Sequence, residues 1–318
     1  MRMTRRGALA LPCTLLAAPA LGQSWPDRPI RMVIAFPAGS VTDTLFRNLA
    51  EPLSHALGQT VVIENRPGGN GVVGTISART AAADGNTWVV LSVTNGALNP
   101  YTVRNLGYDP VNDFTHIGQV AEAPYLLVAP MNGATSTADL IARARARPGQ
   151  LTFSHGNSSA LIASAQMNRT AGVTMTAVPY RGGPEALTDV MAGRIDSTFT
   201  DFANGMAQVR EGRVRALGVT TAQPFPLAPE IPPVGAAVPG FSLTVWFGLA
   251  TVSPAPAGVQ AKANAALNRV LADPEVGARL GRLGYTPTPG TTEHAKTFLA
   301  SEIARYAELA AAVGLERQ

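Results

Sequence analysis

The stretch Phe36-Pro37-Ala38-Gly39-Ser40-Val41-Thr42-Asp43 decides how the chain folds, because it joins a buried strand to a helix. Residues 30–35 before it are mostly apolar and β-leaning, which is typical of a buried strand. After it, apolar residues recur at helical spacing on one face until Gly58 ends the pattern. The octapeptide is therefore a strand-to-helix turn, in which Pro37 and Gly39 make the bend.

Such a turn has the chemistry of an anion site. We expect Thr42 or Asp43 to cap the helix, while the remaining backbone N–H groups and the helix dipole favour negative charge. In an open parallel sheet the turn lies at the carboxyl end of its strand, where ligands bind. A plain β–α connection that binds nothing is the alternative. The predicted ligand-contacting residues of this turn are Phe36, Ala38, Gly39, Ser40, Thr42 and Asp43.

The first 22 residues resemble a secretion signal. Three arginines precede an apolar run from Ala8 to Ala18, and small residues follow. The run is too short for a membrane span of about 20 residues. We therefore expect residues 1–22 to be removed and the protein to be periplasmic, exported by the general pathway or, from Thr4-Arg5-Arg6, by the twin-arginine route.

Composition excludes several classes of protein. Charged residues make up 14% and apolar residues 46% of the 318 residues, which indicates a globular chain with room for two domains. Without residues 1–22 the chain keeps 22 basic against 21 acidic residues, so its charge gives no reason to expect nucleic-acid binding. The only cysteine, Cys13, would leave with the signal, and we expect no disulfide.

Strand and helix patterns alternate along the rest of the chain, which predicts an α/β fold with mostly parallel sheets. We expect Phe114 in a connector and a strand at Tyr125–Val128 that makes the first crossing between two lobes. The strand at Val245–Leu249 would return, and closing helices would span 256–283, broken near Asp273, and 292–313. This assigns 23–124 and 246–318 to lobe I and 125–245 to lobe II, with a ligand cleft between them.

Further polar turns follow other predicted strands, and they supply hydroxyls and backbone N–H groups that suit a carboxylate. Arg181 is the one candidate counter-charge. The predicted ligand-contacting residues of these turns are Ser92, Asn95, Ser154, Gly156, Asn157, Ser158, Ser159, Tyr180, Gly182, Gly183 and Asp201.

Other chemistries fit the sequence poorly. Gly69-Asn70-Gly71-Val72-Val73-Gly74 matches the dinucleotide pattern, but it does not follow its strand directly and lacks the later acidic residue. The four histidines show no metal-ligand spacing, and a pair of His155 with Ser154 or Ser158 lacks the nucleophile elbow of hydrolases. We expect no cofactor, no metal and no catalysis, with an exported α/β hydrolase as the alternative.

A set of short motifs resembles the Bug family, also called TctC-like, the periplasmic receptors of tripartite tricarboxylate transporters. The resemblance runs in order from Trp25 nearly to the end of the chain. The motifs are Trp25-Pro26-Asp27-Arg28-Pro29-Ile30, Phe36-Pro37-Ala38-Gly39, Thr42-Asp43, Glu64-Asn65-Arg66-Pro67-Gly68, Asp84-Gly85, Tyr108-Asp109-Pro110, Asp113-Phe114, Pro179-Tyr180-Arg181-Gly182 and Trp246-Phe247-Gly248-Leu249.

The resemblance implies a two-lobed Venus-flytrap receptor, expected to be a monomer, that captures a small carboxylate for a membrane transporter or a sensor. In that family two turns hold the carboxylate through ordered waters and backbone N–H groups, and they match Phe36–Asp43 and Ser154–Ser159 here. Two departures bear on the ligand. Ser40 replaces the second residue of a glycine pair, and in the second turn Ser158 replaces a glycine and Ile162 a histidine.

Asp201 has two interpretations of equal weight. At the carboxyl end of a strand it would face the cleft, repel a second negative charge on a ligand and favour an N–H or O–H donor. In Bug-like receptors that bind amino acids, an acid at the matching position contacts the amino group. Alternatively, Asp201 is only the cap of the helix that follows.

Overall fold

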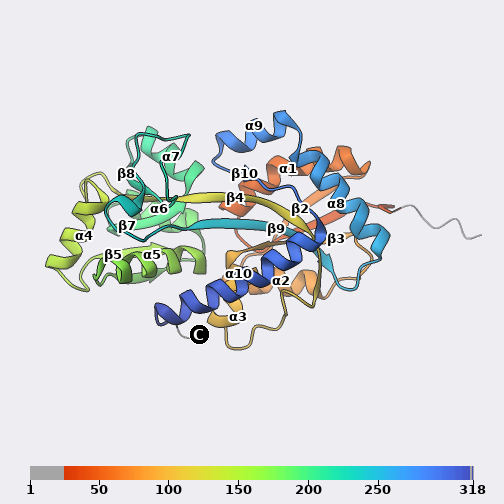
Figure 1. Ribbon diagram of the computed structural model, residues 1–318, viewed down its shortest axis with the longest axis horizontal. Coiled ribbons are helices and arrows are strands. Elements are labelled where there is room, and N and C mark those ends of the chain that lie inside the picture. The colour runs from red at the N-terminus through yellow and green to blue at the C-terminus, as the bar shows by residue number, and fades with distance from the viewer. Residues whose placement is uncertain (1–24, 316, 318) are drawn as a thin grey trace, which may run out of the picture.

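The computed structural model describes residues 25–315 and 317. The predicted signal segment, residues 1–22, lies outside the described residues. Within them, ten strands form one continuous curled sheet with helices on both faces (Figure 1). No described helix is both long and apolar enough to cross a membrane.

Two long strands run through the middle of the molecule and join its two lobes (Figure 1). They are β4 (Phe114–Pro130) and β9 (Thr244–Val252). The first part of β4 pairs with β9, from Phe114 opposite Val252 to Pro124 opposite Thr244, and the rest of β4 pairs with strands of the second lobe. The sheet is therefore shared between the lobes, and the lobe boundaries near 125 and 245 stay a prediction.

The first lobe holds the amino-terminal strands. Besides its part of β4 and β9, its strands are β1 (Ile30–Ile34), β2 (Val61–Asn65), β3 (Thr87–Ser92) and β10 (Thr286–Pro287). Strands β1, β2 and β3 are parallel to one another, and β3 pairs antiparallel with β9. Its helical segments are α1 (Val41–Leu57), η1 (Gly69–Gly71), α2 (Val72–Arg79), η2 (Val93–Leu98), α3 (Asn99–Thr102), α8 (Ala257–Leu271) and α9 (Pro274–Arg282).

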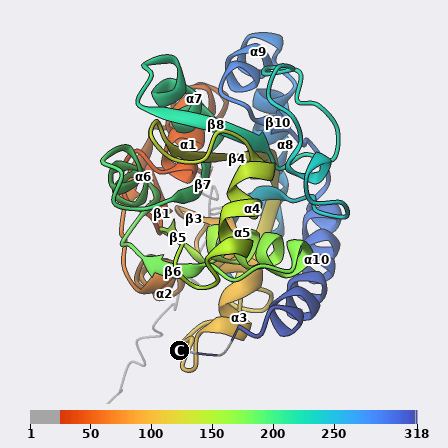
Figure 2. The same cartoon turned by 90° about the vertical axis from the view of Figure 1, so that its left-hand side faces the viewer.

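The second lobe repeats the parallel arrangement, since β5 pairs parallel with β6 and β7. Figure 2 views this lobe, with α4 and α5 toward the reader. Its strands are β5 (Thr152–His155), β6 (Thr176–Pro179), β7 (Ser197–Asp201) and β8 (Val214–Val219). Its helical segments are α4 (Thr137–Ala146), α5 (Ser158–Ala171), α6 (Gly183–Met191), α7 (Phe202–Arg210) and η3 (Val234–Ala236). The long α10 (Thr292–Ala312), from the chain's last segment, packs on η2 of the first lobe and across β4, and also touches α5.

The α/β fold with two lobes is confirmed, but two details of the expectation are wrong. The pairings made by β4 are antiparallel, as is that of β3 with β9, so the sheet is mixed rather than mostly parallel. Phe114 starts β4 instead of lying in a connector. Burial contributed to the second error, because β4 is buried along nearly its whole length and so lacks the in-and-out alternation that reveals a half-exposed strand.

Candidate functional site

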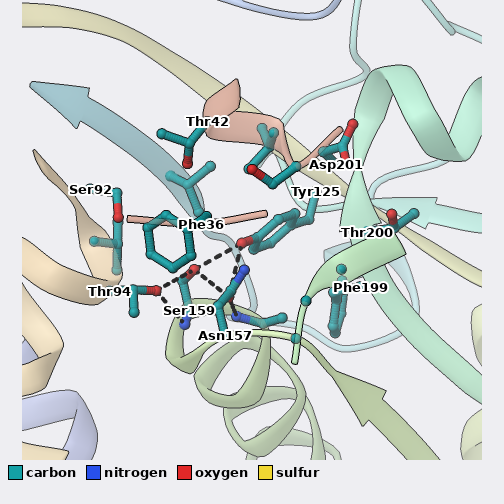
Figure 3. Close-up of a pocket in the computed structure, with 18 of the residues that line it drawn as sticks. Phe36, Thr42, Ser92, Thr94, Tyr125, Asn157, Ser159, Phe199, Thr200 and Asp201 are labelled. Atoms are coloured by element: carbon teal, nitrogen blue, oxygen red, sulfur yellow. Dashed lines mark hydrogen bonds between the residues drawn. The ribbon is translucent and has the colours of Figure 1, made fainter. Parts of the chain in front are cut away.

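A cavity lies between the lobes, where strands of both end and helices begin (Figure 3). The first lobe contributes the turn before α1 and the start of η2, and the second contributes the starts of α5, α6 and α7. The lining residues are Phe36, Pro37, Ser40, Val41, Thr42, Ser92, Val93, Thr94, Tyr125, Gly156, Asn157, Ser159, Ala160, Gly182, Gly183, Ala186, Thr198, Phe199, Thr200, Asp201, Val245 and Phe247.

The electrostatics of this cavity come from helix ends. Helices α1, α5, α6 and α7 all direct their amino termini toward it, with N-cap residues Ser40, Asn157, Gly182 and Asp201. A helix amino terminus carries unpaired N–H groups and partial positive charge, which favour an anion. None of the described lining residues is a lysine, arginine or histidine, and Arg181 is exposed outside the lining. A carboxylate here would be held by N–H and hydroxyl groups.

The turn before α1 has the predicted shape with a different cap. Ser40 is the N-cap, and its hydroxyl accepts from the Asp43 backbone N–H at 3.3 Å, so the expectation of Thr42 or Asp43 as the cap is wrong. Asp43 is buried and its carboxylate accepts instead from Gly39 N–H, at 2.8 Å, and from Arg47 and Asn65. Burial raises the pKa of Asp43, but these hydrogen bonds outweigh it and hold the pKa below its usual value. The Asp43 carboxylate thus stabilises the conformation of the turn without lining the cavity.

A hydroxyl network forms one wall of the cavity. The Tyr125 hydroxyl lies 2.8 Å from Ser159 Oγ and 3.5 Å from Asn157 Oδ1, and Thr94 Oγ1 lies 3.3 Å from Ser159 Oγ (Figure 3). Burial raises the pKa of Tyr125 to about 12, so the hydroxyl stays neutral and able to donate. Hydroxyls of this kind both donate and accept, which lets the wall serve a carboxylate or a hydroxyl of a ligand.

Asp201 is both a cap and a lining residue. Its Oδ1 accepts from Asn204 N–H and its Oδ2 from the Asn204 side-chain amide, each at 2.9 Å. Burial raises the pKa of Asp201 despite these hydrogen bonds. Each carboxylate oxygen has a second lone pair that these bonds leave free. The cap interpretation is therefore correct, and Asp201 lines the cavity as well.

Ten of the predicted contact residues line the cavity: Phe36, Ser40, Thr42, Ser92, Gly156, Asn157, Ser159, Gly182, Gly183 and Asp201. Gly156 is needed for the close approach of two turns, since a Cβ there would lie 2.1 Å from the Gly182 carbonyl carbon. That these residues touch a ligand stays a prediction.

Seven other predicted residues do not line the cavity, and their contacts explain why. Asn95 is fully buried and bonds to Ser92 and Val90, while the Ser154 hydroxyl donates to the Ala186 carbonyl. The Tyr180 hydroxyl donates to Asp189, and Ser158 bonds to Asn70. Ala38 and Gly39 point to solvent, and Asp43 lies behind the turn.

Several lining residues had not been predicted, above all Thr94, Tyr125, Phe199 and Thr200. Phe199 and Thr200 are the last residues of β7 before Asp201, so extending each predicted site one or two residues back along its strand would have included them. Tyr125 lies in the middle of β4 and has no local signal of this kind.

The alternative chemistries find no support in the described residues. No cluster of three or more His, Cys, Asp or Glu that could hold a metal occurs among them. In the dinucleotide-like stretch, Gly74 serves close packing, since a Cβ there would lie 2.6 Å from the Arg66 carbonyl oxygen.

Comparison with known proteins identifies the family. The model of the tripartite tricarboxylate transporter family receptor, TctC, matches residues 45–315. A protein from the tcbD-tcbE intergenic region of Pseudomonas sp. strain P51 is 32% identical over 95% of this chain and 91% of its own length. BugT of Bordetella pertussis is 31% identical over 92% of this chain and 91% of its own length.

Solved structures agree with this assignment. Rpa4515 of R. palustris, solved with adipate, superposes with a TM-score of 0.90 at 30% identity, covering 92% of this chain and all of that one. The periplasmic binding protein BugD gives 0.87 at 27% identity over 92% of this chain and all of its own. MatC from Rhodopseudomonas palustris, with bound malate, gives 0.82 at 27%, covering 90% of this chain and 99% of that chain.

These relatives bind solutes and are not enzymes, so the hydrolase alternative is dropped. The chain belongs to the TctC family of periplasmic receptors and is a Bug-type solute-binding protein.

Proposed function

We propose that this receptor captures a small monocarboxylate that carries a hydrogen-bond donor, such as an amino acid or a pyridine amide, in preference to citrate. The observation that carries the proposal is the placement of Asp201, a buried acid, in a cavity that helix amino termini face and whose described lining holds no lysine, arginine or histidine. One carboxylate of the ligand would lie at the amino termini of α1 and α6, and a donor would meet Asp201.

A second carboxylate would be disfavoured. No lysine or arginine is among the described lining residues to offset its charge, and Asp201 would repel it unless one of the two groups were protonated. The neighbours solved with adipate and malate have dicarboxylates in their sites, so this chain would differ from them in ligand class.

The biological setting that we propose follows the family. Residues 1–22 direct export to the periplasm, and the mature protein, a monomer with lobes 23–124 plus 246–318 and 125–245, delivers its ligand to the membrane subunits of a tripartite tricarboxylate transporter or to a sensor. The support is the match of the family model, which describes receptors of such transporters.

A thermal-shift screen tests the ligand class, because a ligand that binds only the folded state raises the melting temperature. We expect donor-bearing monocarboxylates to stabilise the wild type more than citrate does. Asp201→Ala should remove that shift, but it also removes the cap from Asn204.

Asp201→Asn is the matched control, because an asparagine Oδ1 still caps the helix while the charge is lost. The free Asn variant should stay folded, with a melting temperature lowered by the lost hydrogen bond from the Asn204 side chain, and donor-bearing ligands should raise it by less than they do in the wild type. If citrate stabilises the wild type best, or if the Asn variant binds the donor-bearing ligand equally well, Asp201 is only a cap.

A further inference from the structure

We propose that side chains of the first lobe, Asn70 and Thr94, hold the cleft closed in the absence of ligand by occupying the amino terminus of α5 in the second lobe. The inference concerns the closed state of the protein alone, so it does not depend on which ligand the receptor takes.

The contact between Asn70 and Ser158 is reciprocal. The Asn70 side-chain oxygen accepts from the Ser158 backbone N–H at 3.2 Å, and its amide nitrogen donates to Ser158 Oγ. Ser158 is 3% exposed, so these bonds form away from water. One amide thus satisfies both a backbone and a side-chain group across the cleft.

Thr94 makes the matching contact one residue further along α5. Its Oγ1 accepts from the Ser159 backbone N–H at 3.3 Å and lies 3.3 Å from Ser159 Oγ. Asn157, the N-cap, accepts from Ala160 N–H at 2.8 Å. The first three N–H groups of α5, which a helix leaves without internal partners, are therefore all satisfied by protein groups.

Asn70 has an unusual backbone conformation at this contact. Asn70, at φ 55° and ψ 40°, is the one non-glycine residue with a positive φ between residues 25 and 315. A non-glycine residue in this region is strained and persists where surrounding structure fixes it. Asn99 does so by donating to the Asn70 carbonyl at 3.0 Å, and Asn99 in turn bonds to Tyr108.

Two consequences follow for ligand binding. In the closed state a carboxylate cannot use the first N–H groups of α5, so the helix amino termini left for it are those of α1 and α6. Protein–protein contacts between the lobes also contribute free energy to closure, so closure does not require a ligand long enough to bridge the lobes. The fraction of ligand-free protein that is closed then affects the apparent affinity for the ligand.

A double-mutant cycle on the ligand-free protein tests the proposal. Asn70→Gly removes the amide, and glycine tolerates the positive φ at this position. Ser158→Ala removes Oγ but keeps the backbone N–H. Both variants would be made alone and together, in protein stripped of small molecules by unfolding and refolding.

The readout is energy transfer between dyes on introduced thiols at Glu51→Cys in α1 and Glu211→Cys after α7, both exposed. The background is Cys13→Ser, because Cys13 is the only cysteine in the sequence. Asn70→Gly should lower the ratio of closed to open molecules roughly tenfold, as expected for two lost hydrogen bonds. Ser158→Ala should lower it less.

The coupling is the decisive result. In the Asn70→Gly background, Ser158→Ala should have no further effect, because its partner is already gone. The matched control Ser301→Ala, on the exposed face of α10, should leave the ratio unchanged in either background. An unchanged ratio in Asn70→Gly, or additive effects of Asn70→Gly and Ser158→Ala, would overturn the proposal.

Discussion

The side-chain amide of Asn204 lies 2.9 Å from the carbonyl oxygen of Gly39 and 2.9 Å from Asp201 Oδ2, and thereby joins the two lobes at the edge of the cavity. Gly39 belongs to the turn before α1, and Asn204 lies in the first turn of α7. On its other side, the N–H of Gly39 donates to Asp43. Both backbone polar groups of Gly39 are therefore used to fix the turn, although the residue itself lies outside the cavity lining.

Gly39→Val should weaken ligand binding at least tenfold with little loss of structure. Gly39 has φ +76°, which a β-branched residue adopts only with strain of about 1–3 kcal/mol. Relief of that strain would rotate the groups bonded to Asp43 and Asn204 and displace Ser40 and Thr42 from the cavity. Isothermal titration measures the affinity.

Gly58→Val is the matched control, because Gly58 ends the same helix at φ +71° and, as at Gly39, nothing lies within 4 Å of an added Cβ. It should lose similar stability and keep its affinity. If Gly39→Val binds the ligand as tightly as Gly58→Val does, the turn before α1 is not part of the binding site.

Tyr125→Phe should lower ligand affinity about fivefold, corresponding to the roughly 1 kcal/mol of one hydrogen bond. The hydroxyl lies 2.8 Å from Ser159 Oγ within the cavity lining, and its removal leaves that wall with one donor fewer. Tyr180→Phe is the comparison, since its hydroxyl bonds to Asp189 outside the lining. If Tyr180→Phe weakens binding as much as Tyr125→Phe does, the site extends to Tyr180 as the sequence alone had suggested.

Stability should fall as the pH is lowered below neutrality, and His116 should be one cause. Burial lowers the pKa of His116 to about 4, so the folded protein keeps this side chain neutral while the unfolded chain, with a pKa near 6.5, binds a proton. The stabilisation is present above pH 6.5 and is lost as the pH falls toward 4, by as much as about 3 kcal/mol.

Urea denaturation at several pH values between 7 and 4 measures this dependence. His116→Gln should reduce the pH dependence of the unfolding free energy, whatever its effect at pH 7; part of the dependence should remain, because burial also lowers the pKa of His155 to about 4. His55→Gln, at an exposed position of α1, should leave the slope unchanged. A slope in His116→Gln equal to that of the parent would show that another group is responsible.

Local sequence signals predicted the elements that lead into the cavity but not how the lobes share their sheet. The Phe36–Asp43 turn, the strand before it and the break at Asp273 all follow from short-range patterns, and the structure has them. The length of β4 did not, because Gly118 and Pro124 interrupt it and the strand bulges near Gly118. Glycine and proline normally end a predicted strand.

The candidate site divides in the same way. Residues on turns at strand ends, such as Ser40, Gly156 and Asp201, were found because the turn itself is the signal. Tyr125 enters the cavity only where the two lobes meet, and no pattern within β4 predicts that contact, whereas Thr94 lies in the same turn as the predicted Ser92 and Asn95. Asn95 and Ser154 do not line the cavity, because a polar residue in a turn also serves to satisfy buried backbone groups.

Native mass spectrometry of the protein purified from its own host shows which ligand the receptor carries. We expect one small molecule bound per chain, which on release proves to be an acid with a single carboxylate and an N–H or O–H donor. Loss of that adduct in Asp201→Ala would agree with the role of this residue. A co-purified citrate or other tricarboxylate that Asp201→Ala retains would show that the receptor does not select a donor-bearing monocarboxylate through Asp201.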